Sequence, residues 1–404
     1  MSAIKKISAR QVLDSKGQPT VQVILETDSG RFSASVPSGI STGKYEAWEL
    51  RDKDGGVKRA CQNIEKIIAP VLKGEDPCQQ DEIDSMMVEL DGTNQKKRLG
   101  ANAILAVSMA VCRAGAKAKK MFLWQHLADL ADNRKLKLPQ PCFLLFEGGK
   151  HGDGVISTQE FMVVIKKGTI AEKMALMDKI FAMAKRDLNG KVGIGKEGAF
   201  VTILSSTAAV LETMDHIITR FPGKGLGIII DSAASHFKKG EKYFFEGIKY
   251  DQTGLLRFYK SIINKYPILA IEDPFSENDW QGFRKITKVF GKKTIIIGDD
   301  LLATNLNLAR RAVEEKSCNA MVIKPNQIGT VTETIGVANY AKKQGLKIFA
   351  KHRGGETTDD FLADLAVGLG ADYIATGGFF QKERVVKYQR LLQIEKELSL
   401  NNEQ

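Results

Sequence analysis

The sequence predicts an α/β protein in which a (βα)8-like barrel, residues 137–404, follows an α+β capping domain, residues 1–136. Six apolar runs in the second half recur 23 to 41 residues apart, which leaves room for a buried parallel strand and a returning helix in each unit. The first third instead shows strands followed by helices, which is the order of an α+β unit.

The capping domain divides into a strand region and a helical region. Residues 4–37 alternate between apolar and polar side chains and are interrupted by the turn sequences DSKGQP and DSG, which predicts a β-meander. From Tyr45 to about Asn133 the apolar spacing becomes helical, and this region includes the segment EAWELRD. Pro139 and Pro141 then interrupt the helical pattern and favour a linker at KLKLPQP.

The segment after this linker begins the barrel. CFLLFEGG and EFMVVIKKG predict two strands, and a helix is expected near residues 171–189. A glycine-rich loop, GKVGIGKEGAF, and another helix come next. Strands and helices then alternate through the six apolar runs.

Ionisable side chains end five of the six apolar runs. In a (βα)8 barrel the carboxyl ends of the strands open into one mouth, which carries the active site. An acid after a strand also commonly caps the next helix, but six runs in register favour a shared pocket. In order, the runs end at Asp231, at Glu272 and Asp273, at Asp299 and Asp300, at Lys324, at His352 and Arg353, and at Ala375, which is not ionisable.

Composition favours a cytoplasmic enzyme with a large core. The chain has 404 residues, of which 43% are hydrophobic, and we expect no membrane contact because no apolar stretch approaches the length of a bilayer span. The first residues lack the apolar core of a signal peptide. Five cysteines without paired metal-ligand spacing are expected to be reduced. The net charge of +11 is scattered, which argues against a nucleic-acid partner and favours an anionic small-molecule substrate.

Three carboxylates at neighbouring strand ends predict a magnesium site. Asp231, Glu272 and Asp299 supply hard oxygen ligands, and no cysteine or histidine stands among them, so zinc is not expected. Lys324 comes one unit later, where a divalent charge would lower its pKa. A neutral lysine beside a metal-bound carboxylate suits the removal of a proton α to that group, and the metal stabilises the resulting dianion.

The sequence resembles the enolase family over nearly its whole length, from ISARQVLDSKGQPTVQV to LLQIEKEL. The motifs that carry the resemblance are VPSGISTGKYEAWELRD, LGANAILAVSMAV, QEFMVV, IEDPF, GDDLLATN, IKPNQIGTVTET and HRGGETTDDFLADLAVGL. The resemblance implies an enolase-type barrel whose first units are not all parallel, two Mg²⁺ sites and a homodimer. It also implies the glycolytic dehydration of 2-phospho-D-glycerate, a small phosphorylated carboxylate, to phosphoenolpyruvate.

The resemblance implies roles for individual residues. Lys324 corresponds to the base, Glu197 to the general acid and Glu160 to its partner carboxylate. Without the resemblance, these two glutamates would be ordinary surface acids. Asp231, Glu272 and Asp299 correspond to the ligands of the tighter Mg²⁺ site. The residues implied to bind substrate are His151, Gln159, His352, the phosphate-binding Arg353, and Ser41, which would complete the second Mg²⁺ site when its loop closes.

Several positions depart from the family motifs. Ala375 stands where the family carries a lysine that holds the substrate carboxylate, and losing such a charge-assisted contact is expected to slow the reaction about a hundredfold or more. Gly354 replaces a serine that donates to the phosphate. Lys196 would weaken Glu197 as a proton donor if its side chain turned toward the site. Glu147 replaces the asparagine of an NGG motif.

Two lysines are candidates to replace the missing charge, namely Lys351 and Lys382. Lys351 precedes His352, and neighbours on a strand point to opposite faces, so we expect Lys351 to be a poor substitute. The departures leave two functions open: an active enolase, in which the missing lysine is expected to slow turnover, or an enolase-like protein with lost or weak activity that acts as a binding or structural subunit. A related lyase acting on another carboxylate lies between them.

Overall fold

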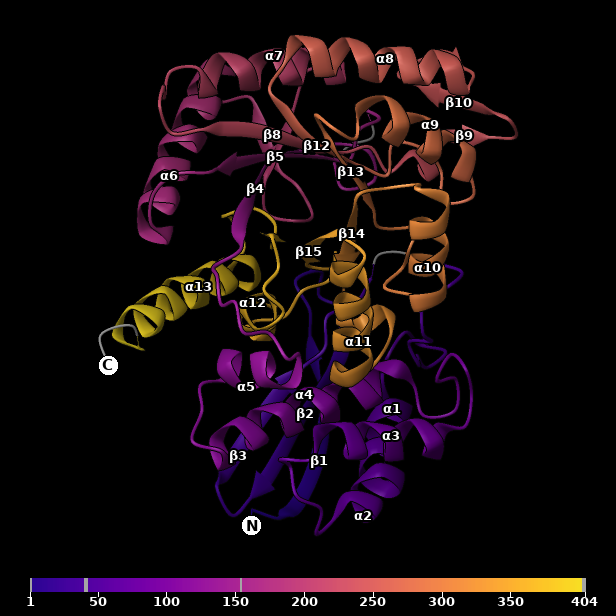
Figure 1. Ribbon diagram of the computed structural model, residues 1–404, viewed down its shortest axis with the longest axis vertical. Helices are drawn as coiled ribbons and strands as arrows, with labels where there is room; N and C mark the ends of the chain where they lie inside the picture. The colour runs from indigo at the N-terminus through magenta and orange to yellow at the C-terminus, as the bar shows by residue number, and fades with distance from the viewer. Residues whose placement is uncertain (1, 40–42, 153–154, 402–404) are drawn as a thin grey trace.

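The structure is a computed structural model that describes residues 2–39, 43–152 and 155–401. A closed eight-stranded barrel with outer helices stands on a smaller N-terminal unit of three strands and several helices (Figure 1). The predicted fold class is therefore confirmed. Among the described residues, none of the helices combines the length and apolarity that a bilayer crossing requires.

The N-terminal unit contains the predicted β-meander. Its strands pair antiparallel in the order β1-β2-β3, and the inward residues Val21, Val23 and Leu25 of β2 are fully buried. The largely buried helix α4 packs against β2 and β3 and covers this apolar face. The elements are β1 (Ile4–Leu13), β2 (Pro19–Thr27), β3 (Gly30–Ser35), α1 (Lys58–Asn63), a π-helical turn (Ile64–Ile68), α2 (Ala69–Leu72), α3 (Gln80–Asp91), α4 (Ala101–Ala118) and α5 (Leu123–Leu130).

The prediction that the helical region starts at Tyr45 is wrong, because the first helix begins at Lys58. The intervening EAWELRD segment is irregular and gives its backbone donors to other parts of the molecule. The Ala47 amide, for example, donates to the carbonyl of Gln327 in the barrel at 2.8 Å. These long-range bonds replace the bonds that a helix would have made within the segment.

The barrel is closed by parallel pairing of β16 with β4. β5 runs antiparallel to both of its neighbours, β4 and β8, whereas all other neighbouring barrel strands are parallel. The first units are thus not all parallel, as the family resemblance implies. The barrel strands are β4 (Gln140–Glu147), β5 (Glu160–Ile165), β8 (Leu226–Asp231), β12 (Ile268–Glu272), β13 (Ile295–Gly298), β14 (Ala320–Ile323), β15 (Lys347–Lys351) and β16 (Tyr373–Ala375).

Helices surround the barrel, and two short sheets interrupt the simple alternation. The loop predicted from its glycines contains the hairpin β6 (Val192–Ile194) and β7 (Phe200–Thr202), and β7 pairs with β4. A small meander, β9 (Lys238–Lys239), β10 (Lys242–Phe245) and β11 (Ile248–Tyr250), lies between β8 and α8. The outer helices are α6 (Ile170–Asp187), α7 (Thr207–Ile218), α8 (Gln252–Lys265), α9 (Trp280–Phe290), α10 (Leu306–Glu315), α11 (Val331–Lys343), α12 (Phe361–Gly368) and α13 (Lys382–Asn401).

Alternate residues of the barrel strands form an inner core that is separate from the core beneath the helices. It includes Ile229, Ala270, Ile297, Val322 and Phe349. Because strand side chains repeat every two residues, the residue two positions further along each of these strands also points into the barrel. Those residues are Asp231, Glu272, Asp299, Lys324 and Lys351.

Arg113 joins the N-terminal unit to the barrel. Its guanidinium donates to both carboxylate oxygens of Asp359, at 2.8 and 2.9 Å, and to Asp360 at 3.0 Å. The Asp359 side chain is only 9% exposed, so this bidentate pair is largely desolvated.

We expect Arg113→Ala to lower the free energy of unfolding by about 3–5 kcal/mol, because it leaves the Asp359 carboxylate buried without its partner. Urea unfolding followed by circular dichroism measures this. The control is Arg186→Ala, whose side chain is 68% exposed and pairs with the adjacent Asp187; it should cost less than about 1 kcal/mol. Equal effects of the two substitutions would contradict the proposed role of Arg113.

Candidate active site

A cavity opens at the carboxyl ends of the barrel strands, and most of the predicted site residues line it. Glu272 is buried beside the cavity, where it contacts Lys351. Ser41 lies outside the described residues, so its predicted role stays a prediction. The predicted residues that line the cavity are His151, Gln159, Glu160, Glu197, Asp231, Asp299, Lys324, His352 and Arg353.

Lys351 lies at the centre of the carboxylates. Its ammonium is 2.6 Å from Glu272 Oε1, 3.1 Å from Asp231 Oδ2 and 3.0 Å from Glu160 Oε2, and its side chain is 4% exposed. Burial lowers the pKa of Lys351, but Asp231 and the other carboxylates outweigh burial and hold this pKa well above its usual value.

Lys351 was expected to be a poor substitute for the missing charge because its side chain would point away from the site. That premise is wrong, since the Lys351 side chain lies inside the barrel mouth. Lys351 is the last residue of β15 and shares the inward direction of Phe349, two residues earlier. His352 follows directly after the end of β15. The group that ends this run inside the barrel is thus Lys351, and both residues reach the cavity.

Lys324 and Asp299 form a second buried ion pair. Burial raises the pKa of Asp299, but Lys324 outweighs this effect and lowers it. Burial lowers the pKa of Lys324, whereas Asp299 raises it, and the net shift is upward. The predicted lowering of the Lys324 pKa is thus not produced by the protein groups; it requires a cation that engages Asp299.

The donor set fits a hard divalent cation. Asp299 Oδ1 is buried and has no hydrogen-bond partner among the described residues. Asp273, Asp299 and Asp300 also offer oxygens that lie within 4.8 Å of one another. Carboxylate oxygens are the ligands that Mg²⁺ prefers. On Asp231 and Glu272, such a cation would share oxygens with the Lys351 ammonium.

Asp273 braces this end of the barrel. Its backbone is in the left-handed region, with φ of 40°, and its carboxylate accepts the amides of Asp299 at 3.1 Å and Asp300 at 2.7 Å. Burial first, and then Asp300, raise the pKa of Asp273 well above its usual value. Asp273 therefore holds the end of the neighbouring strand in place while also lining the cavity.

A second acid group lies on the other side of Lys351. His151 Nδ1 is 3.2 Å from Glu197 Oε2 and 3.6 Å from Glu160 Oε1, and His352 Nε2 is 3.7 Å from Glu197. Burial raises the pKa of Glu160 to about 7. Burial also acts to raise the pKa of Glu197, but His151 and His352 outweigh it and hold this pKa well below its usual value. Of these two glutamates, Glu160 is therefore the one that holds a proton near neutral pH, whereas Glu197 is ionised.

Glu147 positions the loop that carries Glu197. Its carboxylate accepts the backbone amides of Glu197 at 2.9 Å and Ala199 at 2.8 Å. Lys196 turns away from the site and donates to the carbonyl of Lys150 at 2.6 Å. The condition under which Lys196 would weaken Glu197 is therefore not met.

Arg353 and His352 are held by residues from distant parts of the chain. Arg353 Nη1 donates to Glu46 Oε2 at 2.8 Å, which ties the mouth to the irregular segment of the N-terminal unit. Arg384, fully buried in α13, donates to the carbonyls of Arg353 at 2.7 Å and Gly354 at 2.9 Å and also contacts His352 Nδ1. Arg384 thus shapes the loop after β15.

Two family models cover this architecture. The model described as "Enolase, C-terminal TIM barrel domain" matches residues 135–403, and the model described as "Enolase, N-terminal domain" matches residues 4–127. The chain belongs to the enolase family. Its relatives include "Enolase" from Solanum lycopersicum, 42% identical over 98% of this chain and 96% of the relative. Another is "Enolase 1" from Methylococcus capsulatus, 43% identical over 98% of this chain and 97% of the relative.

Several residues have positioning roles that were not predicted from the sequence. For Lys351 a signal was present: it stands two residues after Phe349, which belongs to the inner core, and side chains two apart on a strand share a face. Glu46, Glu147 and Arg384 act through tertiary contacts between segments far apart in sequence, and no local pattern marks them.

The pKa of Glu147 is raised to about 8, first by burial and then by Glu197. Because the folded state binds this proton more tightly than the unfolded chain, this group lowers stability progressively as pH rises from about 4.5 to about 8. We expect the stability of Glu147→Gln relative to wild type to increase over that interval, by a few kcal/mol in order of magnitude.

Urea unfolding at several pH values measures this difference. The control is Glu241→Gln, which changes an exposed glutamate between β9 and β10. A difference between Glu147→Gln and wild type that stays constant with pH would contradict the assignment of the raised pKa to Glu147.

Proposed function

We propose that this enolase-family chain catalyses the Mg²⁺-dependent interconversion of 2-phospho-D-glycerate and phosphoenolpyruvate. The observation that carries the proposal is that one cavity contains both Lys324, paired with Asp299, and the two acids Glu160 and Glu197, whose carboxylate oxygens lie 3.6 and 3.2 Å from His151 Nδ1. A base and an acid in one buried site can remove a proton from one carbon and protonate a hydroxyl on the next.

Asp231, Glu272 and Asp299 are proposed to hold Mg²⁺. When bound there, Mg²⁺ would stabilise the negative charge that develops on the substrate carboxylate. Arg353 is proposed to bind the phosphate, since its planar guanidinium can make two parallel hydrogen bonds to that group. Gln159 contributes to this arrangement through its backbone amide, which donates to the carbonyl of Asp231 at 2.8 Å.

Lys324 is proposed to act as the base. It has to be neutral to accept a proton, and in the described structure Asp299 favours its charged form. When Asp299 is engaged by another positive charge, its attraction for the Lys324 proton weakens and the Lys324 pKa falls. Base strength is thereby linked to assembly of the complete site.

Glu197 is proposed to donate the proton to the departing hydroxyl, with Glu160 as its partner. Of the two acids, Glu160 has the raised pKa and Glu197 the lowered one, so the proton held near neutral pH would pass from Glu160 to Glu197 before Glu197 donates it. His151 lies within 3.6 Å of both acids and is placed to stabilise the negative charge that the pair acquires after donation.

The alternative function is an enolase-like subunit with lost or weak activity. It is favoured by Ala375, which offers no charge to a substrate, and by the ammonium of Lys351, which contacts two of the proposed Mg²⁺ ligands. A cytoplasmic location, a homodimer and the second Mg²⁺ site with Ser41 are further proposals, and they rest on composition and on the resemblance to enolases.

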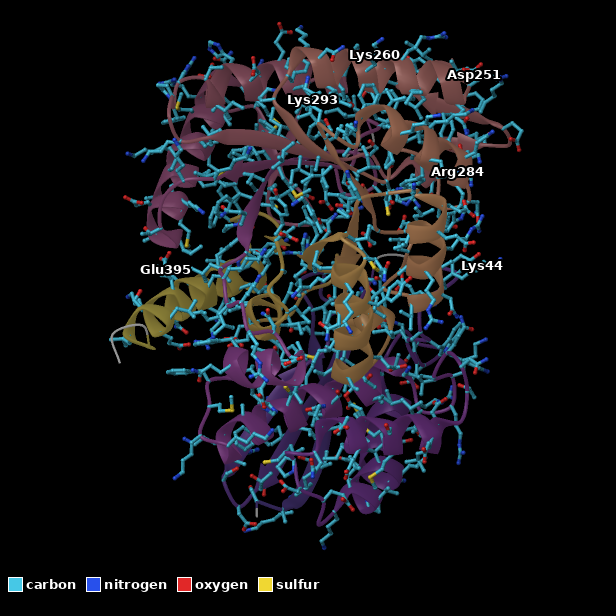
Figure 2. The ribbon with its side chains drawn as sticks, viewed as in Figure 1. Lys44, Asp251, Lys260, Arg284, Lys293 and Glu395 are labelled. Atoms are coloured by element: carbon cyan, nitrogen blue, oxygen red, sulfur yellow. The ribbon has the colours of Figure 1, made fainter. Side chains whose placement is uncertain are left out.

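Lys324→Ala is expected to lower turnover of 2-phosphoglycerate with saturating Mg²⁺ by about 10²–10⁴-fold, because it removes the proposed base. A coupled assay of phosphoenolpyruvate formation measures this. The control is Lys260→Ala, since Lys260 is exposed on the outer helix α8 (Figure 2), and it should match wild type.

Exchange of the substrate α proton with deuterium in the solvent separates the two proposed roles. Lys324→Ala should lose this exchange, whereas Glu197→Gln should retain it while losing dehydration. Failure of the wild type to turn over 2-phosphoglycerate would favour the alternative function. Full dehydration by Lys324→Ala would show that another group is the base.

A further inference from the structure

Lys351 is built into the mouth of the barrel at a high electrostatic cost. Its ammonium is buried among carboxylates from three strands, Glu160 on β5, Asp231 on β8 and Glu272 on β12. A buried ion pair is often no more stabilising than apolar residues of similar volume. Stability alone therefore does not account for the Lys351 ammonium at this place. Because Lys351 lines the cavity, a ligand bound there would contact its ammonium.

Lys351 and Ala375 occupy equivalent positions on adjacent strands. They are register partners in the parallel pair β15–β16, and Ala375 belongs to the inner core of the barrel. Register partners on neighbouring parallel strands lie about 4.8 Å apart and point to the same face. A lysine at either position can therefore bring its ammonium to the same carboxylates, and the small Ala375 side chain leaves that space to Lys351.

The charges around Lys351 favour an anionic partner once the carboxylates are engaged. A divalent cation on Asp231 and Glu272 would compete with the ammonium for their oxygens. The displaced ammonium would remain in a buried cavity, where an unpaired charge is unfavourable. The carboxylate of a bound substrate is the partner that restores its ion pair.

We propose that Lys351 is a substrate-binding residue that contacts the substrate carboxylate, in place of a lysine at the position of Ala375. The inference rests on the proposed function for the identity of the substrate. In this view the lysine that is missing at Ala375 on β16 is replaced by Lys351 on β15. The mouth of the barrel therefore keeps one positive charge at this level.

The test compares Lys351→Ser, Ala375→Lys and the double variant that carries both changes. Lys351→Ser should lower kcat/KM for 2-phosphoglycerate about a hundredfold or more at saturating Mg²⁺, since the charge-assisted contact is lost. The double variant should recover to within about tenfold of wild type. The matched control is Lys347→Ser, which changes the exposed lysine at the opposite end of the same strand and should leave turnover unchanged.

Calorimetric binding of phosphoenolpyruvate at saturating Mg²⁺ provides a second readout that does not need turnover. Lys351→Ser should weaken this binding and the double variant should restore it. If the wild type binds phosphoenolpyruvate through Lys351 but does not turn over, the proposed function fails and the assignment of Lys351 stands.

Three results would overturn the inference. The first is that Lys351→Ser keeps or gains activity and binds Mg²⁺ more tightly than wild type. Lys351 would then only compete with the cation for the carboxylates. Lys351→Ser and wild type could bind phosphoenolpyruvate equally. If Lys351→Ser does not fold, the double variant decides, because a folded double variant that neither binds nor turns over ligand would contradict relocation.

Discussion

The mouth of the barrel depends on one constraint, that charges withdrawn from water must be paired. Asp231, Glu272 and Glu160 are each no more than 3% exposed, and isolated carboxylates in such surroundings would be strongly destabilised. The ammonium of Lys351 lies within 3.1 Å of all three and supplies the compensating charge. The Lys351 ammonium also lines the cavity, where an anionic ligand could contact it.

The N-terminal unit contributes to this site through contacts at the mouth. Glu46 holds Arg353, and a backbone bridge between Ser38 and Gly355 joins the two parts of the chain directly beside it. A Cβ on Gly355 would lie 2.1 Å from a carboxylate oxygen of Asp14, so a larger residue there would require the Asp14 side chain to move. The irregular EAWELRD segment thus contributes Glu46 to the wall of the cavity and holds the Arg353 side chain there.

The acid side of the site depends on an equally close contact. A Cβ on Gly378, just after β16, would lie 2.0 Å from the carbonyl oxygen of Gly198, so only glycine lets this segment approach the Glu197 loop. Glu147 holds the same loop from the other side through two backbone amides. The position of Glu197 relative to His151 thus follows from packing between β4, the β6–β7 hairpin and the end of the barrel.

Local and periodic features were determined by the sequence alone. The meander, the barrel and the ionisable strand ends follow from apolar spacing and turn residues, because these patterns express which side chains must be buried. The predicted linker KLKLPQP is cut short, since its Gln140 and Pro141 already belong to β4. The resemblance to enolases added roles for groups such as Glu197 that no spacing identifies.

The tertiary structure alone decided the features that are set by contacts between distant segments. EAWELRD has helical spacing but is irregular because its backbone bonds to other parts of the chain. Lys351, rather than His352, ends its strand inside the barrel because the inward face is set by pairing with β14 and β16. A shift of one residue in that register would have exchanged their faces, and this choice depends on the neighbouring strands.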